Sequence, residues 1–358
     1  MRLVEFEYTD GLWTLHPIHF VKSNLFVGTN STGKSRAIEA IRFCSDFIAQ
    51  KEVLHHFFNM TGIIDCKMTF EDSDSIIKYN FSIRNNKVKS ERLVQITNGR
   101  ESLIIRRSIR TCSLNREKIT PPVDKLLIQV RRDKQQYPIF EKIIHWAENT
   151  FFIPFSMLKN LTLIEYAKNG PNISDYLLAL SKEQKEHLIE KVNTLNYKIK
   201  DIKVEKIGEA KFPVIVEEGI KALLPIFTLS IGMVCAIYIL ILLEYLSNRE
   251  MPSCILVDDF SEGLDYERSK ELGKLVFDYS SKNGIDIIVS SNDSFLMDIV
   301  PIDCWIILTR NGSEVSNLSK RTHPDLFEEF SFTGLNNFML FSSNYIERYL
   351  SKHKSKDE

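Results

Sequence analysis

The chain has 358 residues, of which 44% are hydrophobic and 26% are charged, and its formal net charge is −1 at pH 7. This composition describes an ordinary folded soluble protein, long enough for one large core or two smaller ones. The near-neutral charge excludes a global basic field that would attract nucleic acid. Residues 84–134 nevertheless carry 14 Lys and Arg against 5 Asp and Glu, a local charge of +9.

The six cysteines contain no C-x-x-C pair and lie mostly in apolar stretches: Cys44, Cys66, Cys112, Cys235, Cys254 and Cys304. They predict small buried side chains in a reducing compartment, with neither a disulfide framework nor a zinc site. The first residues lack a signal-peptide pattern. We therefore expect a cytoplasmic protein.

The beginning of the chain predicts two or three strands, and the last of them, 24–27, leads into a glycine-rich loop. Gly28 to Ser35 reads GTNSTGKS, which fits G-x-x-x-x-G-K-[ST], and a helix with one apolar face is expected over 36–50. Glycines allow such a loop to curl its N–H groups around phosphates at a helix N-terminus. Lys34 is expected to reach the β- and γ-phosphates, and the Ser35 hydroxyl to bind Mg²⁺.

The middle of the chain predicts an antiparallel meander and then a mixed region with several helices. The meander strands are expected at 66–70, 76–81, 91–96 and 103–106. Helices are expected at 139–148, 173–180 and 183–195, followed by paired strands at 200–206 and 212–217.

Residues 222–243 contain no charged side chain and are long enough to require a membrane check. Pro225, Thr228, Ser230 and Gly232 interrupt the first half of this segment, and the remaining apolar part is too short to cross a bilayer. A buried core helix is the favoured interpretation, so no membrane association is expected.

The last third predicts strands at 253–258, 285–290 and 304–309, with a helix at 266–281 between the first two. Continuous apolar strands of this kind are typical of a parallel sheet that is covered on both faces. A further helix is expected at 344–351.

The strand at 253–258 ends in two carboxylates, Asp258 and Asp259. A phosphate-loop protein places its second magnesium-associated acid at the end of such a strand. Asp258 is thus expected to serve the metal, and Asp259 to orient the attacking water.

The frame DDFSEGLD, from Asp258 to Asp265, resembles the ABC-type ATPases, and within them the SMC/RecF/OLD-like branch. Asn30 and the Ala40-Ile41 pair are similar to the same branch. The resemblance implies an α/β phosphate-loop NTPase of ABC-ATPase type, with a mixed sheet, an antiparallel N-terminal meander and a helical insertion. It also implies ATP and Mg²⁺ as cofactors.

The stretch LSIGM, from Leu229 to Met233, is similar to the signature loop of that family and lies about 25 residues before the acidic pair. The resemblance implies that Ser230 and Gly232 close over the γ-phosphate held by a second copy. A head-to-tail homodimer around ATP follows.

Two positions depart from the family pattern. Asp259 stands where a catalytic Glu is usual, and Asn292 stands at the position of the switch His. Asn can donate a hydrogen bond to the γ-phosphate but cannot carry a proton. Since a small geometric error can cost on the order of 10²-fold in rate, we expect slow turnover.

The resemblance assigns catalysis to Lys34, Asp259 and Asn292, and the metal to Ser35 and Asp258. Nucleotide contacts are expected from Gly28, Asn30, Ser31, Thr32, Gly33, Lys34, Ser35, Arg36, Ser230, Gly232 and Asp265. Candidates for the glutamine loop are Gln95, Gln129, Gln135 and Gln136, and candidates for adenine stacking are Trp13 and Phe20, which are more commonly strand-core aromatics.

We expect four parts along the chain. They are an N-terminal ATPase lobe at 1–110, a mixed or helical insertion at 111–225, a second ATPase lobe at 226–320 and a helical tail at 321–358.

The leading functional hypothesis is an ATP-gated switch, as found in prokaryotic anti-phage defence modules. About 50 residues follow Thr309, too few for the Toprim nuclease of OLD-like relatives, so the effector (a nuclease or toxin) is expected on another polypeptide. Alternatives are an ATP-binding scaffold with negligible turnover and a RecF/SMC-like repair ATPase that binds DNA. DNA contacts would come from Arg106, Arg107, Arg110, Arg131, Arg132 and Lys134, although this segment can also be a solvated face or a docking site for an acidic partner.

Overall fold

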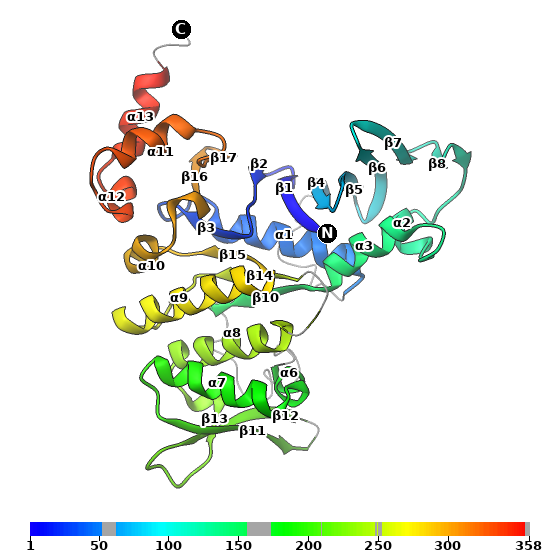
Figure 1. The fold of residues 1–358 in the computed structure, drawn as a ribbon. Coiled ribbons are helices and arrows are strands. Elements are labelled where there is room, and N and C mark those ends of the chain that lie inside the picture. The colour runs from blue at the N-terminus through cyan, green and yellow to red at the C-terminus, as the bar shows by residue number, and fades with distance from the viewer. Residues whose placement is uncertain (52–61, 156–172, 209, 248, 250–252, 355–358) are drawn as a thin grey trace.

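The computed structural model describes residues 1–51, 62–155, 173–208, 210–247, 249 and 253–354. In this part of the chain, one large mixed sheet has helices on both faces, and a smaller α/β unit lies at one end (Figure 1). The order of the strands in the large sheet is β10-β14-β15-β3-β16-β17-β2-β1-β4-β5-β6-β7-β8-β9.

The first five strands of this order are parallel: β10 (Thr150–Pro154), β14 (Cys254–Asp258), β15 (Asp286–Ser290), β3 (Ser23–Val27) and β16 (Trp305–Asn311). Successive residues of β3 enter different cores, with Leu25 and Val27 on one face and Phe26 on the other. The expected parallel sheet with two covered faces is therefore confirmed. The edge strand β10 was not expected.

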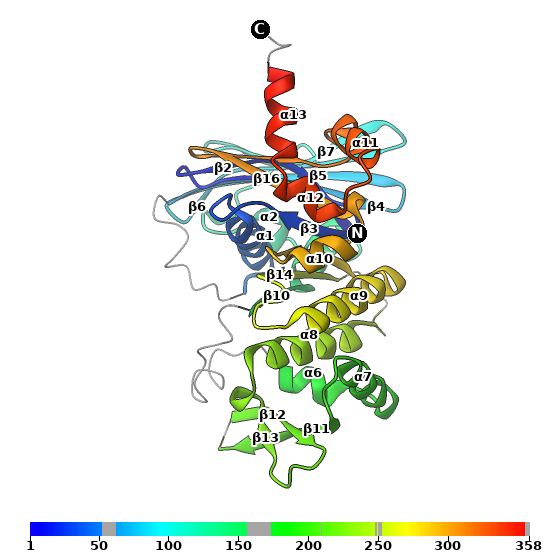
Figure 2. The ribbon, with the colours of Figure 1, turned by 90° about the vertical axis from the view of Figure 1, so that its left-hand side faces the viewer.

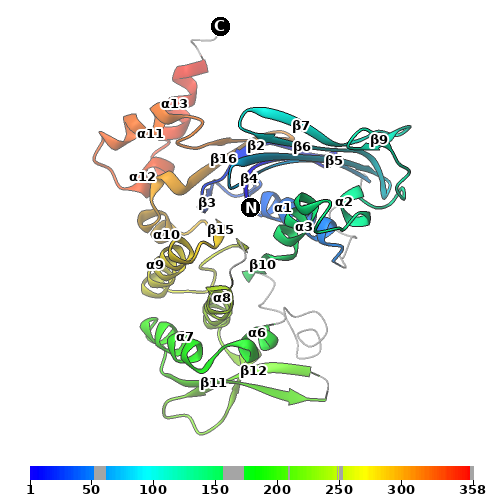
Figure 3. The same cartoon turned by 45° about the vertical axis from the view of Figure 1, so that its right-hand side comes forward.

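The rest of the sheet is largely antiparallel. It is formed by β17 (Glu314–Leu318), β2 (Thr14–His19), β1 (Arg2–Thr9), β4 (Ile63–Asp72), β5 (Ser75–Arg84), β6 (Lys87–Thr97), β7 (Arg100–Arg107), β8 (Cys112–Leu114) and β9 (Glu117–Lys118). The expected four-stranded meander is present as β4 to β7. One face of the meander packs on a core shared with α1 (Lys34–Ala49), α2 (Leu127–Val130) and α3 (Pro138–Glu148), as Figure 3 shows.

The other face of the parallel strands is covered by α8 (Ile231–Ser247), α9 (Tyr266–Asn283) and α10 (Ser294–Ile299). Nearly all of α8 is buried, because α9 covers one side and α6 (Ile173–Ala179) and α7 (Lys182–Thr194) cover another. Beyond them lies a small sheet of β11 (Ile199–Ile207), β12 (Ala210–Glu217) and β13 (Leu224–Pro225). The apolar segment at 222–243 thus contributes a core helix, whose buried Glu244 pairs with Lys191 of α7.

None of the helices in the described ranges combines the length and apolar character that a membrane span requires. All six cysteines are free, and all but Cys304 are buried. After the sheet, the chain forms α11 (Pro324–Ser331), α12 (Asn337–Ser342) and α13 (Tyr345–Lys354), and α13 extends away from the sheet (Figure 2).

The described residues of 111–225, expected as one insertion, are distributed over four places. β8 and β9 extend the meander, α2 and α3 pack beside α1, β10 forms the edge of the parallel strands, and α6 to β13 form the small unit beneath α8. Strand pairing places these segments, because β10 takes its position from hydrogen bonds to β14 and not from its neighbours along the chain.

Candidate active site

The site lies where three parallel strands end. Val257 of β14 is in register with Val289 of β15, which is in register with Leu25 of β3. Because the carboxyl ends of parallel strands meet at one edge of a sheet, the residues that follow each strand come together. These residues are the glycine-rich loop after β3, the acidic pair at the end of β14 and the switch after β15.

The backbone of the loop requires glycine at two positions. A Cβ atom on Gly28 would lie 2.5 Å from Oγ1 of Thr32 and 2.9 Å from the carbonyl oxygen of Leu308. Gly33 has a φ of 102°, and Ser31 has a φ of 69°. The backbone therefore has positive φ values at two of the three positions before α1 begins. Turns of this kind direct successive N–H groups into an anion-binding concavity.

Lys34 lies across this loop. Its ammonium donates to the carbonyl oxygens of Gly28 at 2.7 Å and Thr29 at 3.2 Å. Burial lowers the pKa of Lys34, and the charges of Asp259 and Asp258 act in the opposite direction. The lysine and both carboxylates therefore share one electrostatic environment, although more than 220 residues separate them along the chain.

Ser290, at the end of β15, holds the two acids together. Its hydroxyl donates to Oδ1 of Asp258 at 2.6 Å and accepts from the backbone N–H of Asp259 at 2.9 Å. Asp259 has a φ of 56°, a conformation that few residues other than glycine adopt, and this hydrogen bond fixes it. Ser290 was not among the residues predicted for the site. A hydroxyl at the end of an apolar strand, just before the expected switch, was the available signal.

Asp258 also faces the start of α1. The Ser35 side chain hydrogen-bonds with it. Burial raises the pKa of Asp258 above its ordinary value, and the hydrogen bonds from Ser290 and Ser35 act in the opposite direction. A hydroxyl and a carboxylate are hard oxygen donors, which suits Mg²⁺. No group of three His, Cys, Asp or Glu residues able to hold a metal occurs among the described residues. Such a group is not required, since Mg²⁺ keeps several waters and binds substrate phosphates.

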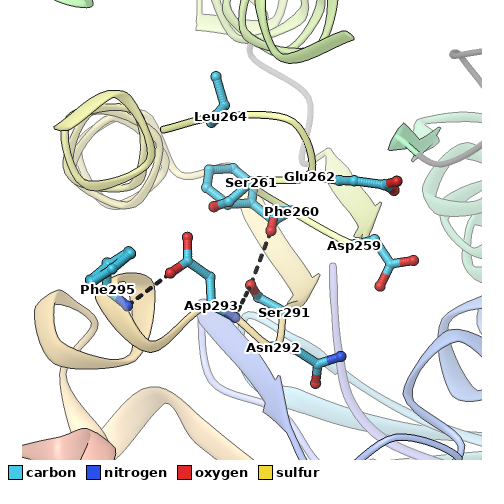
Figure 4. A pocket seen from close by; sticks show the side chains of 9 residues that line it. All are labelled: Asp259, Phe260, Ser261, Glu262, Leu264, Ser291, Asn292, Asp293 and Phe295. Carbon is cyan, nitrogen blue, oxygen red and sulfur yellow. Dashed lines mark hydrogen bonds between the residues drawn. The ribbon is translucent and has the colours of Figure 1, made fainter. Parts of the chain in front are cut away.

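Asn292, in the switch that follows β15, lies against the glycine-rich loop that follows β3. Its Nδ2 donates to Oδ1 of Asn30 at 2.9 Å, so the switch and the phosphate loop touch. Figure 4 shows the side chains of Asp259 and Asn292 extending to the same side from neighbouring strand ends. Both family departures thus lie beside the loop.

A cavity of about 530 Å³ lies between the acidic turn, residues 258–265, and the switch, residues 291–293 (Figure 4). It is lined by Asp259, Phe260, Ser261, Glu262, Leu264, Ser291, Asn292, Asp293 and Phe295. Hydroxyl groups tie its two walls. Ser291 Oγ donates to the Phe260 carbonyl at 3.0 Å, and Ser269 of α9 bonds to both Ser261 and Asp293.

The signature stretch packs directly on the acidic turn. Ser230 is exposed, and its Oγ accepts from the backbone N–H of Met233 at 3.4 Å at the start of α8. A Cβ atom on Gly232 would lie 2.4 Å from the carbonyl oxygen of Gly263. Ser230 and the turn after Asp259 are therefore parts of one surface.

Two other predicted contacts have structural partners within the chain. Asp265 caps α9 by accepting from the Arg268 N–H at 3.0 Å. Arg36 pairs with Asp10 at 2.9 Å, and its guanidinium lies 4.9 Å from the centre of the Trp13 ring.

The open candidates for adenine stacking and the glutamine loop lie as follows. Trp13 and Phe20 are both buried in the core. Gln129 donates to the carbonyl of Phe47 at 2.6 Å, and Gln95 donates to Ser75 in the meander. Gln135 and Gln136 lie exposed before α3.

Comparisons with known proteins identify the family and the fold. The family model described as AAA domain, putative AbiEii toxin, Type IV TA system, matches residues 23–298. No curated protein matches the sequence. An SMC head bound to the C-winged helix domain of ScpA is similar in structure, with a TM-score of 0.53 and 14% identity, over 91% of this chain and 100% of that one.

Two more SMC heads match with lower scores. The head domain from Thermotoga maritima gives a TM-score of 0.45 at 14% identity, over 89% of this chain and 99% of that one. The Pyrococcus furiosus head, bound to the C-terminal domain of ScpA, gives 0.47 at 13% identity, over 92% and 99%. The fold is that of an ABC-type ATPase of the SMC/RecF-like branch, as the sequence predicted.

The close contact between the signature stretch and the acidic turn predicts the effect of Gly263→Ala. The new methyl group would lie 2.2 Å from Cγ2 of Ile231, at a φ of 78°. We expect a loss of about 3 kcal/mol in the free energy of unfolding, measured by urea titration. The matched control is Gly284→Ala, because Gly284 has a φ of 67° but open space around it, and only about 1 kcal/mol should be lost there. Equal losses for the two variants would contradict the packing argument.

Proposed function

The chain belongs to the AAA-domain family described as putative AbiEii toxin of type IV toxin–antitoxin systems, and we propose that it is an ATP-gated dimeric switch. In this proposal ATP closes two copies head to tail, slow hydrolysis opens them, and the motion controls a separate effector protein in an anti-phage defence module. The toxin–antitoxin context in the family description supports the biological role.

The observation that carries the proposal is the division of the site into two parts. The loop, Lys34 and Asp258 gather at one sheet edge, whereas Ser230 stands exposed at the N-terminus of α8. A helix of 17 residues presents a positive dipole end there, which favours a phosphate. An exposed signature serine is available to a nucleotide bound by a second copy.

The roles of the residues follow from their places. Lys34 and the loop N–H groups would bind the phosphates, and Ser35 and Asp258 would hold Mg²⁺. A bound Mg²⁺ neutralises charge on the phosphates. Asp259, fixed by Ser290, would orient the attacking water, and Asn292 would exchange its hydrogen bond to Asn30 for one to the γ-phosphate.

Asp259 is the basis of a prediction about rate. Its carboxylate is one methylene shorter than the family's Glu, so we expect turnover of about 0.1 s⁻¹ or slower, which is on the order of 10²-fold below a median enzyme. Asp259→Asn should reduce phosphate release at least tenfold, whereas Glu267→Gln, an exposed acid on α9, should leave it unchanged. A native rate of about 10 s⁻¹ would contradict slow turnover. An unchanged rate in Asp259→Asn would remove this residue from the mechanism.

The shared site predicts complementation between two inactive variants. Lys34→Ala and Ser230→Arg should each abolish ATP hydrolysis alone, because each homodimer loses both of its sites. A one-to-one mixture should recover about a quarter of native activity, since half of the dimers are mixed and each mixed dimer has one intact site. Phosphate release from the mixture is the measurement.

The control for that experiment is a mixture of Lys34→Ala with the double variant Lys34→Ala/Ser230→Arg, which contains no intact site. Recovery in both mixtures would point to contamination or trivial stabilisation. If neither mixture recovers activity, each site is built within one copy and the dimeric switch is wrong.

A second candidate function is nucleic-acid binding. It is favoured by the outer face of the meander, which is the face turned away from α1, α2 and α3. Arg92 of β6 and Arg106 of β7 are both exposed and lie directly opposite each other across the strands. Like charges in this arrangement repel, and no carboxylate pairs with either arginine within the described residues. A cavity of about 770 Å³, lined in part by Arg106 and Arg116, adjoins them.

The basic segment as a whole is not one surface. Arg107, named with Arg106 in the sequence analysis, is buried and donates to the carbonyls of Lys125 and Pro122. Arg132 pairs with Glu141 on α3, on the opposite face of the meander. These two residues are therefore removed from the candidate nucleic-acid contacts.

If the outer face binds duplex DNA, the double variant Arg92→Ala/Arg106→Ala should weaken binding regardless of sequence. The slope of log affinity against log salt should become shallower by about 1.8, because two phosphate contacts are lost. Fluorescence anisotropy over a salt series measures both effects. Lys182→Ala/Lys203→Ala, two exposed lysines of the small unit, is the charge-matched control. Binding that is absent, or equal in both variants, would favour docking of an acidic protein instead.

A further inference from the structure

The acidic turn carries an exposed carboxylate that no contact within the chain explains. Glu262 lies one residue before Gly263, and its backbone N–H donates to the carbonyl of Asp259 at 3.1 Å. Figure 4 shows its side chain extending outward on the same side as Asp259. In the part of the chain that the structure describes, Glu262 forms no ion pair and no side-chain hydrogen bond.

Arg310 lies beside the phosphate loop. Because Ile307 of β16 is in register with Val27 of β3, the residues that follow in β16 run alongside the loop. The Arg310 guanidinium donates to the carbonyl of Ser31 at 3.2 Å and to that of Gly312 at 2.7 Å. It is exposed, and none of the described carboxylates pairs with it.

The contact between Gly232 and Gly263 fixes where Glu262 must go in a dimer. If Ser230 of one copy approaches the loop of a second copy, the turn packed against Gly232 must approach the same loop. That loop carries Arg310 on Ser31. In such a dimer, Glu262 of one copy would lie near Arg310 of the other. Because the two copies are identical and related by symmetry, the same contact would occur twice.

We propose that Glu262 of one copy forms an ion pair with Arg310 of a second copy in the ATP-bound dimer. The proposal rests on the dimer of the proposed function and adds the residues that align its two copies. A guanidinium binds a carboxylate through two parallel N–H groups, so this pair fixes orientation as well as attraction. The cavity beside Glu262 gives the arginine side chain space.

Charge reversal tests the pair. Arg310→Glu and Glu262→Arg should each weaken dimer formation at least tenfold in the presence of AMP-PNP and Mg²⁺, measured by analytical ultracentrifugation of the full chain. The double variant Arg310→Glu/Glu262→Arg should recover most of the native affinity, because the charges meet again in reversed order. Asp278→Arg, an exposed acid farther along α9, is the matched control and should behave as the native chain does.

The nucleotide affinity of each variant, measured with a fluorescent ATP analogue at concentrations where the chain is monomeric, separates a dimer defect from damage to the chain's own loop. Arg310→Gln, which keeps donors for the Ser31 carbonyl, serves the same purpose. If the native chain dimerises with AMP-PNP but the double variant is as weak as the two single effects combined, the ion pair is wrong and the dimer stands. If the native chain stays monomeric at every concentration, both the pair and the proposed function are wrong.

Discussion

Strands β3, β14 and β15 lie parallel and in register, so their carboxyl ends deliver residues 28–35, 258–259 and 290–292 to one edge of the sheet. This pairing is the constraint on which the site depends. A slip of one residue between β14 and β15 would turn Asp258 away from Ser290, because side chains alternate across a strand. Ser290 then holds both acids in place through its hydrogen bonds with the Asp258 carboxylate and the Asp259 backbone N–H.

A second constraint is the burial of α8. The helix lies between the main sheet with α9 and the small unit of α6, α7 and β11 to β13, which explains why its sequence is apolar on every side. Its N-terminus remains at the surface with Ser230, while Gly232 touches Gly263. A core helix is thus packed against the acidic turn at its N-terminal end and against the small unit along its side.

The fold was predictable where local patterns are strong. The four meander strands alternate apolar and polar residues, and the apolar runs 253–258 and 285–290 are bounded by polar turns, so both were identified with small errors at their ends. β10 was missed, because five residues that directly follow α3 give too short a pattern. The six residues of α10 and of α12 are equally short, and they are held by capping and by mutual packing that no local pattern reveals.

The sequence by itself determined which residues make up the candidate site: the glycine-rich loop with Lys34 and Ser35, the acids Asp258 and Asp259, and Ser230 and Gly232 at the start of α8. These features are predictable because a loop or strand end uses residue types at fixed local spacing. Only the tertiary structure decided that Ser290 joins the two acids, that Arg107 is buried while Arg106 is exposed, and that Arg310 reaches the loop. Each of these contacts links residues whose proximity comes from strand pairing and packing across the sheet, and separation along the chain carries no information about it.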